Sequence, residues 1–145
     1  MSETPCIAVR RLTRRLPSGG RLLTILDSID LEIARGESVA IFSASPEFYL
    51  TPFVHSISPD IAVFGSVVEE RSGQLQIHNL FREGKAAKAR EFIASRTAAH
   101  VCVYTDHWHD LSLMRLAERV VLVGPTPATV SAVRRAGIAF ETIAA

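Results

Sequence analysis

The sequence predicts an α/β fold in which a parallel sheet is flanked by helices and preceded by a β-rich N-terminal segment. From residue 38 onward, short apolar runs alternate with segments of helical pattern, which is typical of strand–helix–strand units. Before residue 38, β-prone runs are separated by the turn sequence Pro17-Ser-Gly-Gly20. With 145 residues, of which 48% are hydrophobic, the chain is long enough for one domain with a packed core.

Each expected element has its own local signal. The expected strands are apolar or alternating runs bounded by turn residues, at 7–12, 22–26, 29–33, 38–42, 61–68, 74–80, 101–105, 120–123 and 139–143. Helices are expected at 85–95, 111–117 and 129–136. An earlier helix is expected to start at Pro46 with Ser45 as its N-cap. Antiparallel pairing is expected through the turn Ala34-Arg-Gly-Glu37.

Composition argues against several classes of function. Sixteen Lys and Arg against fifteen Asp and Glu leave a net charge of +1, which favours neither nucleic acid nor an anionic membrane as a partner. No apolar stretch reaches the ~18 residues of a membrane span, and the first residues lack the pattern of a signal peptide, so we expect a cytoplasmic protein. Cys6 and Cys102 lie far apart. Because Cys102 sits in an apolar run, we expect a buried free thiol rather than a disulfide.

Four polar residues lie where parallel sheets place their functional sites. Ser43 and Asp106 each directly follow an expected strand, Lys85 opens a helix, and Asp110 comes four residues after Asp106. Sites of such folds form at the carboxyl ends of strands, so we expect these side chains to converge at one edge of one sheet. A hydroxyl and a lysine can contact a phosphoryl group, and carboxylates are the hard oxygen ligands that suit Mg²⁺.

Each candidate also has a structural alternative. Ser43 and Asp110 can act as helix caps, and Lys85 can be an ordinary surface residue. His107 and His109 lie between the two aspartates and could suggest a transition-metal site. Since no third nitrogen or sulfur ligand is evident nearby, solvent-facing or substrate-edge histidines are the favoured interpretation.

Residues 38–145 resemble the haloacid dehalogenase superfamily, and within it the phosphoserine phosphatase-like branch. The resemblance rests on Val39-Ala-Ile-Phe-Ser43, on Gly84-Lys85, and on Val103-Tyr-Thr-Asp106-His-Trp-His-Asp110, in the order of that family's second, third and fourth motifs. It implies a Rossmann-like, truncated phosphohydrolase-type domain that acts on a small phosphorylated molecule or binds free phosphate. It also implies phosphate contacts from Ser43 and Lys85, and Mg²⁺ bound by Asp106 and Asp110.

The family's first motif, a nucleophilic Asp-x-Asp pair, occurs nowhere in the chain. Asp27 follows an apolar run, but the acid–base position two residues later is Ile29, which cannot transfer a proton. Glu32 comes two residues after Asp30, and both fit the exposed face of an alternating strand. Asp27 is therefore only a weak candidate nucleophile, and we expect an inactive or very weak phosphatase.

Residues 1–42 resemble the start of an ABC transporter ATPase of the lipoprotein-export type. The likeness rests on Leu26-Asp-Ser-Ile-Asp-Leu-Glu-Ile and Arg35-Gly-Glu-Ser-Val-Ala-Ile. Where such ATPases carry Gly-x-x-x-x-Gly-Lys-Ser/Thr, this chain has Phe42-Ser-Ala-Ser-Pro-Glu-Phe, which lacks the amides and lysine that hold phosphates. We therefore expect no ATP binding by this segment.

The two resemblances meet inside residues 38–42, which predicts an ATPase-like segment at 1–42 joined to a phosphatase-like domain at 43–145. A gene fusion would give this sequence, and so would an internal deletion or a reading-frame artefact. The alternatives to the phosphohydrolase interpretation are a non-catalytic fusion remnant, an interaction module and, less favoured, a nucleotide-binding fragment of a transporter.

Overall fold

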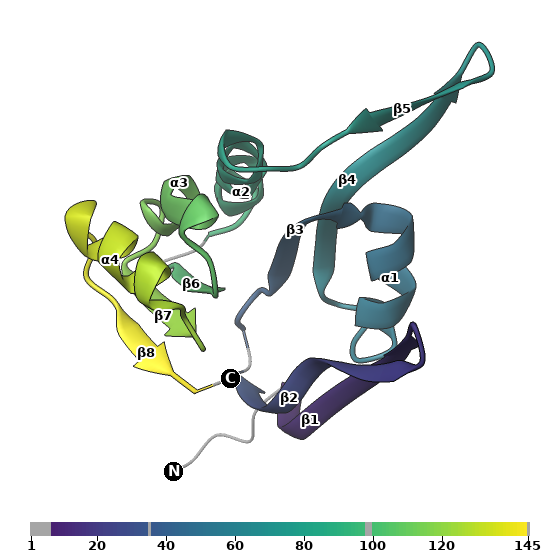
Figure 1. Ribbon diagram of the computed structural model, residues 1–145. Coiled ribbons are helices and arrows are strands. Elements are labelled where there is room, and N and C mark those ends of the chain that lie inside the picture. The colour runs from purple at the N-terminus through teal and green to yellow at the C-terminus, as the bar shows by residue number, and fades with distance from the viewer. Residues whose placement is uncertain (1–6, 35, 98–99, 145) are drawn as a thin grey trace. The chain divides into compact units, whose positions relative to one another are not determined.

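Figure 1 shows a computed structural model of the chain, which describes residues 7–34, 36–97 and 100–144 and, for most of the first two strands, the backbone only. The chain divides into two compact units, residues 1–38 and 39–144. The described part of the first unit forms two strands, and the second unit combines helices with parallel strands. The predicted α/β class with a β-rich N-terminal segment is therefore confirmed. Cys6 lies outside the described residues.

The first unit is a β-hairpin. Strands β1 (Ile7–Ser18) and β2 (Arg21–Ile33) pair antiparallel through a turn in which Gly19 and Gly20 have φ angles of 57° and 77°, the left-handed region that glycine adopts readily. The two strands expected at 22–26 and 29–33 form one continuous strand. The expected antiparallel pairing across residues 34–37 is wrong, because β2 pairs with β1 whereas the next strand joins a separate sheet.

In the second unit, the first sheet has the order β3-β4-β5. Strands β3 (Ala40–Pro46) and β4 (Ala62–Arg71) are parallel, and helix α1 (Glu47–His55) connects them. Strand β5 (Gln74–His78) returns antiparallel to β4 through a tight turn, and Figure 1 shows this hairpin extending beyond α1. The local periodicities predicted all four elements, with small shifts at their ends.

The remainder of this unit contains a second sheet of three parallel strands in the order β6-β7-β8. Its elements are α2 (Glu83–Ala94), β6 (Cys102–Thr105), a 3₁₀ turn (Trp108–Asp110), α3 (Leu111–Met114), β7 (Arg119–Val123), α4 (Pro127–Arg135) and β8 (Glu141–Ile143). None of the helices in the described part of the chain is long and apolar enough to span a membrane.

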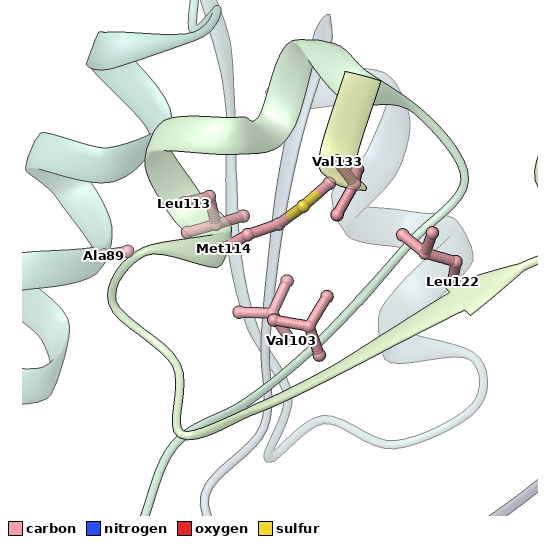
Figure 2. Close-up of a cluster of buried hydrophobic side chains, with 7 residues drawn as sticks. Ala89, Val103, Leu113, Met114, Leu122 and Val133 are labelled. Carbon is pink, nitrogen blue, oxygen red and sulfur yellow. The ribbon is translucent and has the colours of Figure 1, made fainter. Parts of the chain in front are cut away.

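The core lies on one face of this second sheet (Figure 2). Helices α2, α3 and α4 and strands β6 and β7 supply its buried side chains, namely Ala89, Val103, Leu113, Met114, Val120, Leu122 and Val133. Strand β6 alternates, so Val103 faces this core while Cys102 lies on the exposed side. The thiol is free, as predicted, but the expectation that it is buried is wrong, because only one face of β6 is covered.

The connection from β3 to α1 is closely packed. The Glu47 carboxylate accepts a hydrogen bond from the Gly65 amide at 3.0 Å, and a Cβ at Gly65 would lie only 2.6 Å from the Glu47 Cα. Ser45 does not cap α1, since Pro46 occupies the N-cap position and makes no side-chain capping bond. The Ser45 amide instead donates to the Ser43 hydroxyl at 3.1 Å. Backbone packing against Gly65 therefore fixes this connection.

Candidate functional site

A buried ion pair links the start of α2 to the loop after β6. The Lys85 Nζ donates to Asp110 Oδ1 at 2.8 Å, and the two side chains are only 12% and 11% exposed. The Thr105 hydroxyl donates to the other carboxylate oxygen, Asp110 Oδ2, at 2.7 Å. Both oxygens of Asp110 therefore have a donor, and the lysine is held in one orientation by residues 20 or more positions away in the sequence.

Local structure explains how these three side chains meet. Lys85 lies in the first turn of α2, Thr105 is the last residue of β6, and Asp110 ends the 3₁₀ turn that follows. Asp110 also occupies the N-cap position of α3, but its side chain makes no capping bond there. The side chain contacts Lys85 instead. Asp110 therefore occupies a helix-capping position, as the structural alternative proposed, but its carboxylate does not bond to the helix.

In the part of the chain that the structure describes, neither Asp106 nor Ser43 makes a hydrogen bond or ion pair with Lys85 or Asp110. Asp106 is exposed, and among the described residues its carboxylate has no partner. Ser43 is half-buried in the middle of β3, which belongs to the first sheet, whereas β6 belongs to the second. The expectation that these residues share one edge of one sheet is therefore wrong, since β3 pairs with β4 and β6 with β7. Asp27 lies within β2, not at the end of a strand.

Aromatic rings and a guanidinium group form a cluster around His109, the residue before Asp110. The His109 ring lies 4.1 Å from that of Trp108, 4.1 Å from that of His107 and 5.0 Å from that of Phe81. The Arg82 guanidinium lies 5.1 Å from the Phe81 ring and 5.5 Å from the Trp108 ring, within cation–π range. Sequence reasoning missed Phe81 and Arg82. Their position within four residues of Lys85 in the sequence was the available signal.

Arg82 also has a backbone conformation that is unusual for a residue with a side chain. Its φ is 46° at the N-cap of α2, in the left-handed region. Such a conformation costs on the order of 1–3 kcal/mol and persists where surrounding contacts over-determine it. Here the contacts with Phe81 and Trp108 accompany it, so the entry to α2 is fixed beside the ion pair.

The histidines of this cluster do not form a metal site with their neighbours. The His107 Nδ1 accepts a hydrogen bond from the His109 amide at 3.1 Å. Desolvation lowers the pKa of His109 below its usual 6.5, and the nearby His107 and Arg82 lower it further. Within the described residues, no group of three His, Cys, Asp or Glu side chains is placed to hold a metal ion.

Comparison with known proteins adds two partial likenesses. The chain is 28% identical over 116 residues to "Lipoprotein-releasing system ATP-binding protein LolD 1" from Rhodopirellula baltica, a match that covers 80% of this chain and 46% of that protein. It is also similar to the crystal structure of a protein of unknown function from Bordetella pertussis Tohama I, with a TM-score of 0.61 and 21% identity over 74% of this chain and 51% of that one. The second likeness shows the fold alone. The chain spans about half the length of each of these proteins.

A more extensive match comes from a family description. The sequence model of the haloacid dehalogenase-like hydrolases matches residues 7–115, well over half of the chain. The match begins inside the N-terminal hairpin and includes Lys85, Thr105 and Asp110. The predicted division of the chain at residue 42 remains a prediction. On the strength of this match, the chain belongs to the haloacid dehalogenase-like hydrolase family.

Proposed function

We propose that this chain binds the phosphate group of a small phosphorylated molecule, or free phosphate, and has little or no phosphatase turnover. The observation that carries the proposal is the buried Lys85–Asp110–Thr105 network. A lysine that is already held in place loses little side-chain freedom when it pairs with an anion. The ammonium group has three donors, so it can contact a phosphate oxygen while it keeps its bond to Asp110.

Ser43 is the second proposed phosphate contact. It lies in the middle of β3 and directly follows Phe42, where the regular parallel pairing of β3 with β4 ends, and parallel strands present their ligands at that end of the pairing. Its hydroxyl already accepts the Ser45 amide, which leaves its own proton to donate to a phosphate oxygen. β3 and α2 are in contact through the rings of Phe42 and Phe92, and one phosphate must be reached by both Ser43 and Lys85 from these two elements.

Hydrolases of this family generally use Mg²⁺, which neutralises the charge of the phosphoryl group when bound. Mg²⁺ is usually held by one or two carboxylates together with the phosphate of the substrate. Asp106 offers an exposed carboxylate for direct contact. Both oxygens of Asp110 already accept hydrogen bonds, so Asp110 can join the ion only if Lys85 or Thr105 releases it. The residues present therefore fit an ion that arrives with a phosphate, with Asp106 as its principal protein ligand.

The absence of turnover follows from the missing first motif. The chain has no Asp-x-Asp, and the weak candidate Asp27 lies in the middle of β2. General acid–base catalysis alone typically contributes ~10²–10⁴-fold, and without a nucleophile no covalent intermediate forms. A positioned lysine can bind the phosphoryl group, but it cannot replace the attacking carboxylate.

The similarity to LolD 1, whose name describes an ATP-binding protein, suggests ATP as a second candidate ligand. The sequence that leads from β3 into α1, Phe42-Ser-Ala-Ser-Pro-Glu-Phe, has no glycine and no Lys-Ser/Thr pair. Such loops bind phosphates through a row of backbone amides, which needs glycine conformations. We therefore propose phosphate recognition at Lys85 and no ATP binding by residues 1–42.

The test compares two lysines of the same helix. Lys85 is nearly buried and paired with Asp110, whereas Lys88 is 50% exposed and pairs with Glu91 one turn later. Inorganic phosphate and p-nitrophenyl phosphate would be titrated calorimetrically into the full chain and into its Lys85→Met and Lys88→Met variants. We expect Lys85→Met to weaken binding about 10-fold or more, as for a lost charge-assisted hydrogen bond, and Lys88→Met to leave it unchanged.

Circular dichroism must show that both variants remain folded. Equal phosphate affinity in the parent chain and in folded Lys85→Met would overturn the site. Turnover of p-nitrophenyl phosphate with Mg²⁺ should stay at background. Clear turnover that Asp27→Asn or Asp30→Asn abolishes would show that the hairpin supplies a nucleophile, and saturable ATP binding that survives Lys85→Met would show a separate nucleotide site.

A further inference from the structure

Strand β5 presents an open and apolar sheet edge. It is the last strand in the order β3-β4-β5, so one side of its backbone has no neighbouring strand among the described residues. All five of its residues are exposed, with Leu75 at 74% and Ile77 at 62%. An edge of this kind is a template for pairing with another chain. The hairpin that carries it is visible in Figure 1 as the segment β4–β5.

The exposed apolar side chains of β5 continue onto neighbouring elements. Ile77 is paired with Val68 on β4. Val68 and Val67 line the same surface hollow as Phe48 of α1, which is 71% exposed. Ile77, Val68 and Phe48 thus connect the edge of the sheet to α1. A contiguous exposed apolar patch on a folded domain marks an interaction surface more often than a chance arrangement.

The edge lacks the residues that usually prevent strands from pairing. Its sequence, Gln74-Leu-Gln-Ile-His78, contains no lysine, aspartate, glutamate or proline. The charged residues of the hairpin, Glu69, Glu70 and Arg71, lie on β4, behind this edge. A strand that pairs with β5 therefore meets no acidic side chain and no lysine on β5 itself.

We propose that β5 pairs antiparallel with β5 of a second copy of this chain, about a two-fold axis at Gln76. This register places Leu75 opposite Ile77 of the second copy, and Ile77 opposite its Leu75. Four apolar side chains then lie together on one face of a continuous six-stranded sheet. The two-fold axis makes the contact self-complementary, so the pairing closes as a dimer and does not propagate.

Charge placement supports a second copy as the occupant. On the other face, the axis brings Gln76 against Gln76 of the second copy, a neutral pair. Glu69, the β4 neighbour of Gln76, lies one strand farther from the axis and is within 3.7 Å of His78. The acidic residues of the two copies are therefore kept apart by two glutamines, and no like charges face one another across the new strand pair.

The register can be tested by disulfide cross-linking. In a Cys6→Ser/Cys102→Ser background, Gln76→Cys places a thiol on the axis, where antiparallel partners lie ~4.5–5.5 Å apart, within the range of a disulfide. Gln74→Cys is the matched control, because it lies on the same face of the same exposed strand. Its counterpart in the second copy would be ~13 Å away along the strand. Under mild oxidation, we expect dimers from Gln76→Cys and none from Gln74→Cys. Equal cross-linking of both would overturn the register.

A second experiment tests the apolar pairs themselves. Sedimentation equilibrium of the full chain should show a dimer that Leu75→Glu or Ile77→Lys each weakens about 10-fold, since each change alters two symmetric cross-strand pairs. A mixture of the two variants should dimerise more tightly than either alone, because the introduced carboxylate then faces the introduced ammonium group. A chain that is monomeric at all concentrations, or a mixture no tighter than its parts, would overturn the proposal.

Discussion

The two sheets of residues 39–144 differ sharply in how they bury their apolar side chains. In the β6–β8 region, Leu122 and Val133 are fully buried and Met114 is 1% exposed. In the β3–β5 region, the buried hydrophobic residues among those described are Val54 and Ile61, while Leu75 and Ile77 face solvent. Both regions have apolar strands, but in one of them three helices cover a sheet face. Helix coverage, and not hydrophobic content, decides which region is packed.

Three phenylalanines join the two regions. The Phe42 ring of β3 stacks on that of Phe64 at 4.9 Å, and both meet the Phe92 ring of α2 edge-on, at 6.3 and 5.8 Å. Phe42 also packs against the C-terminal core. The less packed region is therefore attached to the better packed one through aromatic contacts with α2.

The largest expected effect separates the two regions directly. Leu122→Ala removes a fully buried side chain from the core, so we expect the free energy of unfolding to fall by about 2–5 kcal/mol. Leu75→Ala removes a side chain that is 74% exposed, so the expected change is within about 0.5 kcal/mol. Urea denaturation at low protein concentration measures both values. Similar losses in the two variants would mean that the hairpin is packed after all.

The next effect tests whether the β3–β5 region has a point of close packing. Gly65→Ala places a Cβ 2.6 Å from the Glu47 backbone, and we expect a loss of about 1–3 kcal/mol. Gly84→Ala is the matched control, because the nearest atom to its Cβ is 3.7 Å away. Alanine in this helix should leave stability unchanged or raise it by up to ~1 kcal/mol. Equal melting temperatures of the Gly65→Ala and Gly84→Ala variants would mean that Gly65 is not a point of close packing.

The smallest effect concerns an exposed ion pair of the better packed region. Arg119 donates two hydrogen bonds to the Glu141 carboxylate, at 3.0 and 2.9 Å, and thereby lowers the pKa of Glu141 below its usual 4.5. Because the folded-state pKa is lowered, the stabilisation is present above pH 4.5 and is lost as the pH falls through the lowered value. Both side chains are more than half exposed, so the effect on stability should be small.

Carboxyl NMR titration gives the measurement for this pair. In Arg119→Gln, the pKa of Glu141 should rise toward 4.5, and the unfolding free energy should lose this part of its dependence on acid pH. An unchanged pKa in Arg119→Gln would show that another group holds the carboxylate.

Local sequence patterns alone predicted the order and type of nearly every element from residue 38 onward. Periodicity identifies a strand or helix because it depends on which neighbours along the chain share a face. Periodicity does not define where an element ends. Observed ends therefore differ from the expected ones by a few residues, as at α3, which is shorter than expected. The cap at Ser45 failed because Gly65 packs against the backbone of Glu47, a contact between residues 18 positions apart.

The sequence by itself determined which residues could carry charge or bind phosphate, since side-chain chemistry is independent of the fold. Only the tertiary structure decided that Lys85 meets Asp110 across 25 positions, that Phe81 packs against His109 and Arg82 lies over Trp108, and that Cys102 is exposed. It also separated the strand of Ser43 from that of Asp106. These outcomes depend on which face of each strand the helices cover and on which strands pair, and neither is encoded in a local run of residues.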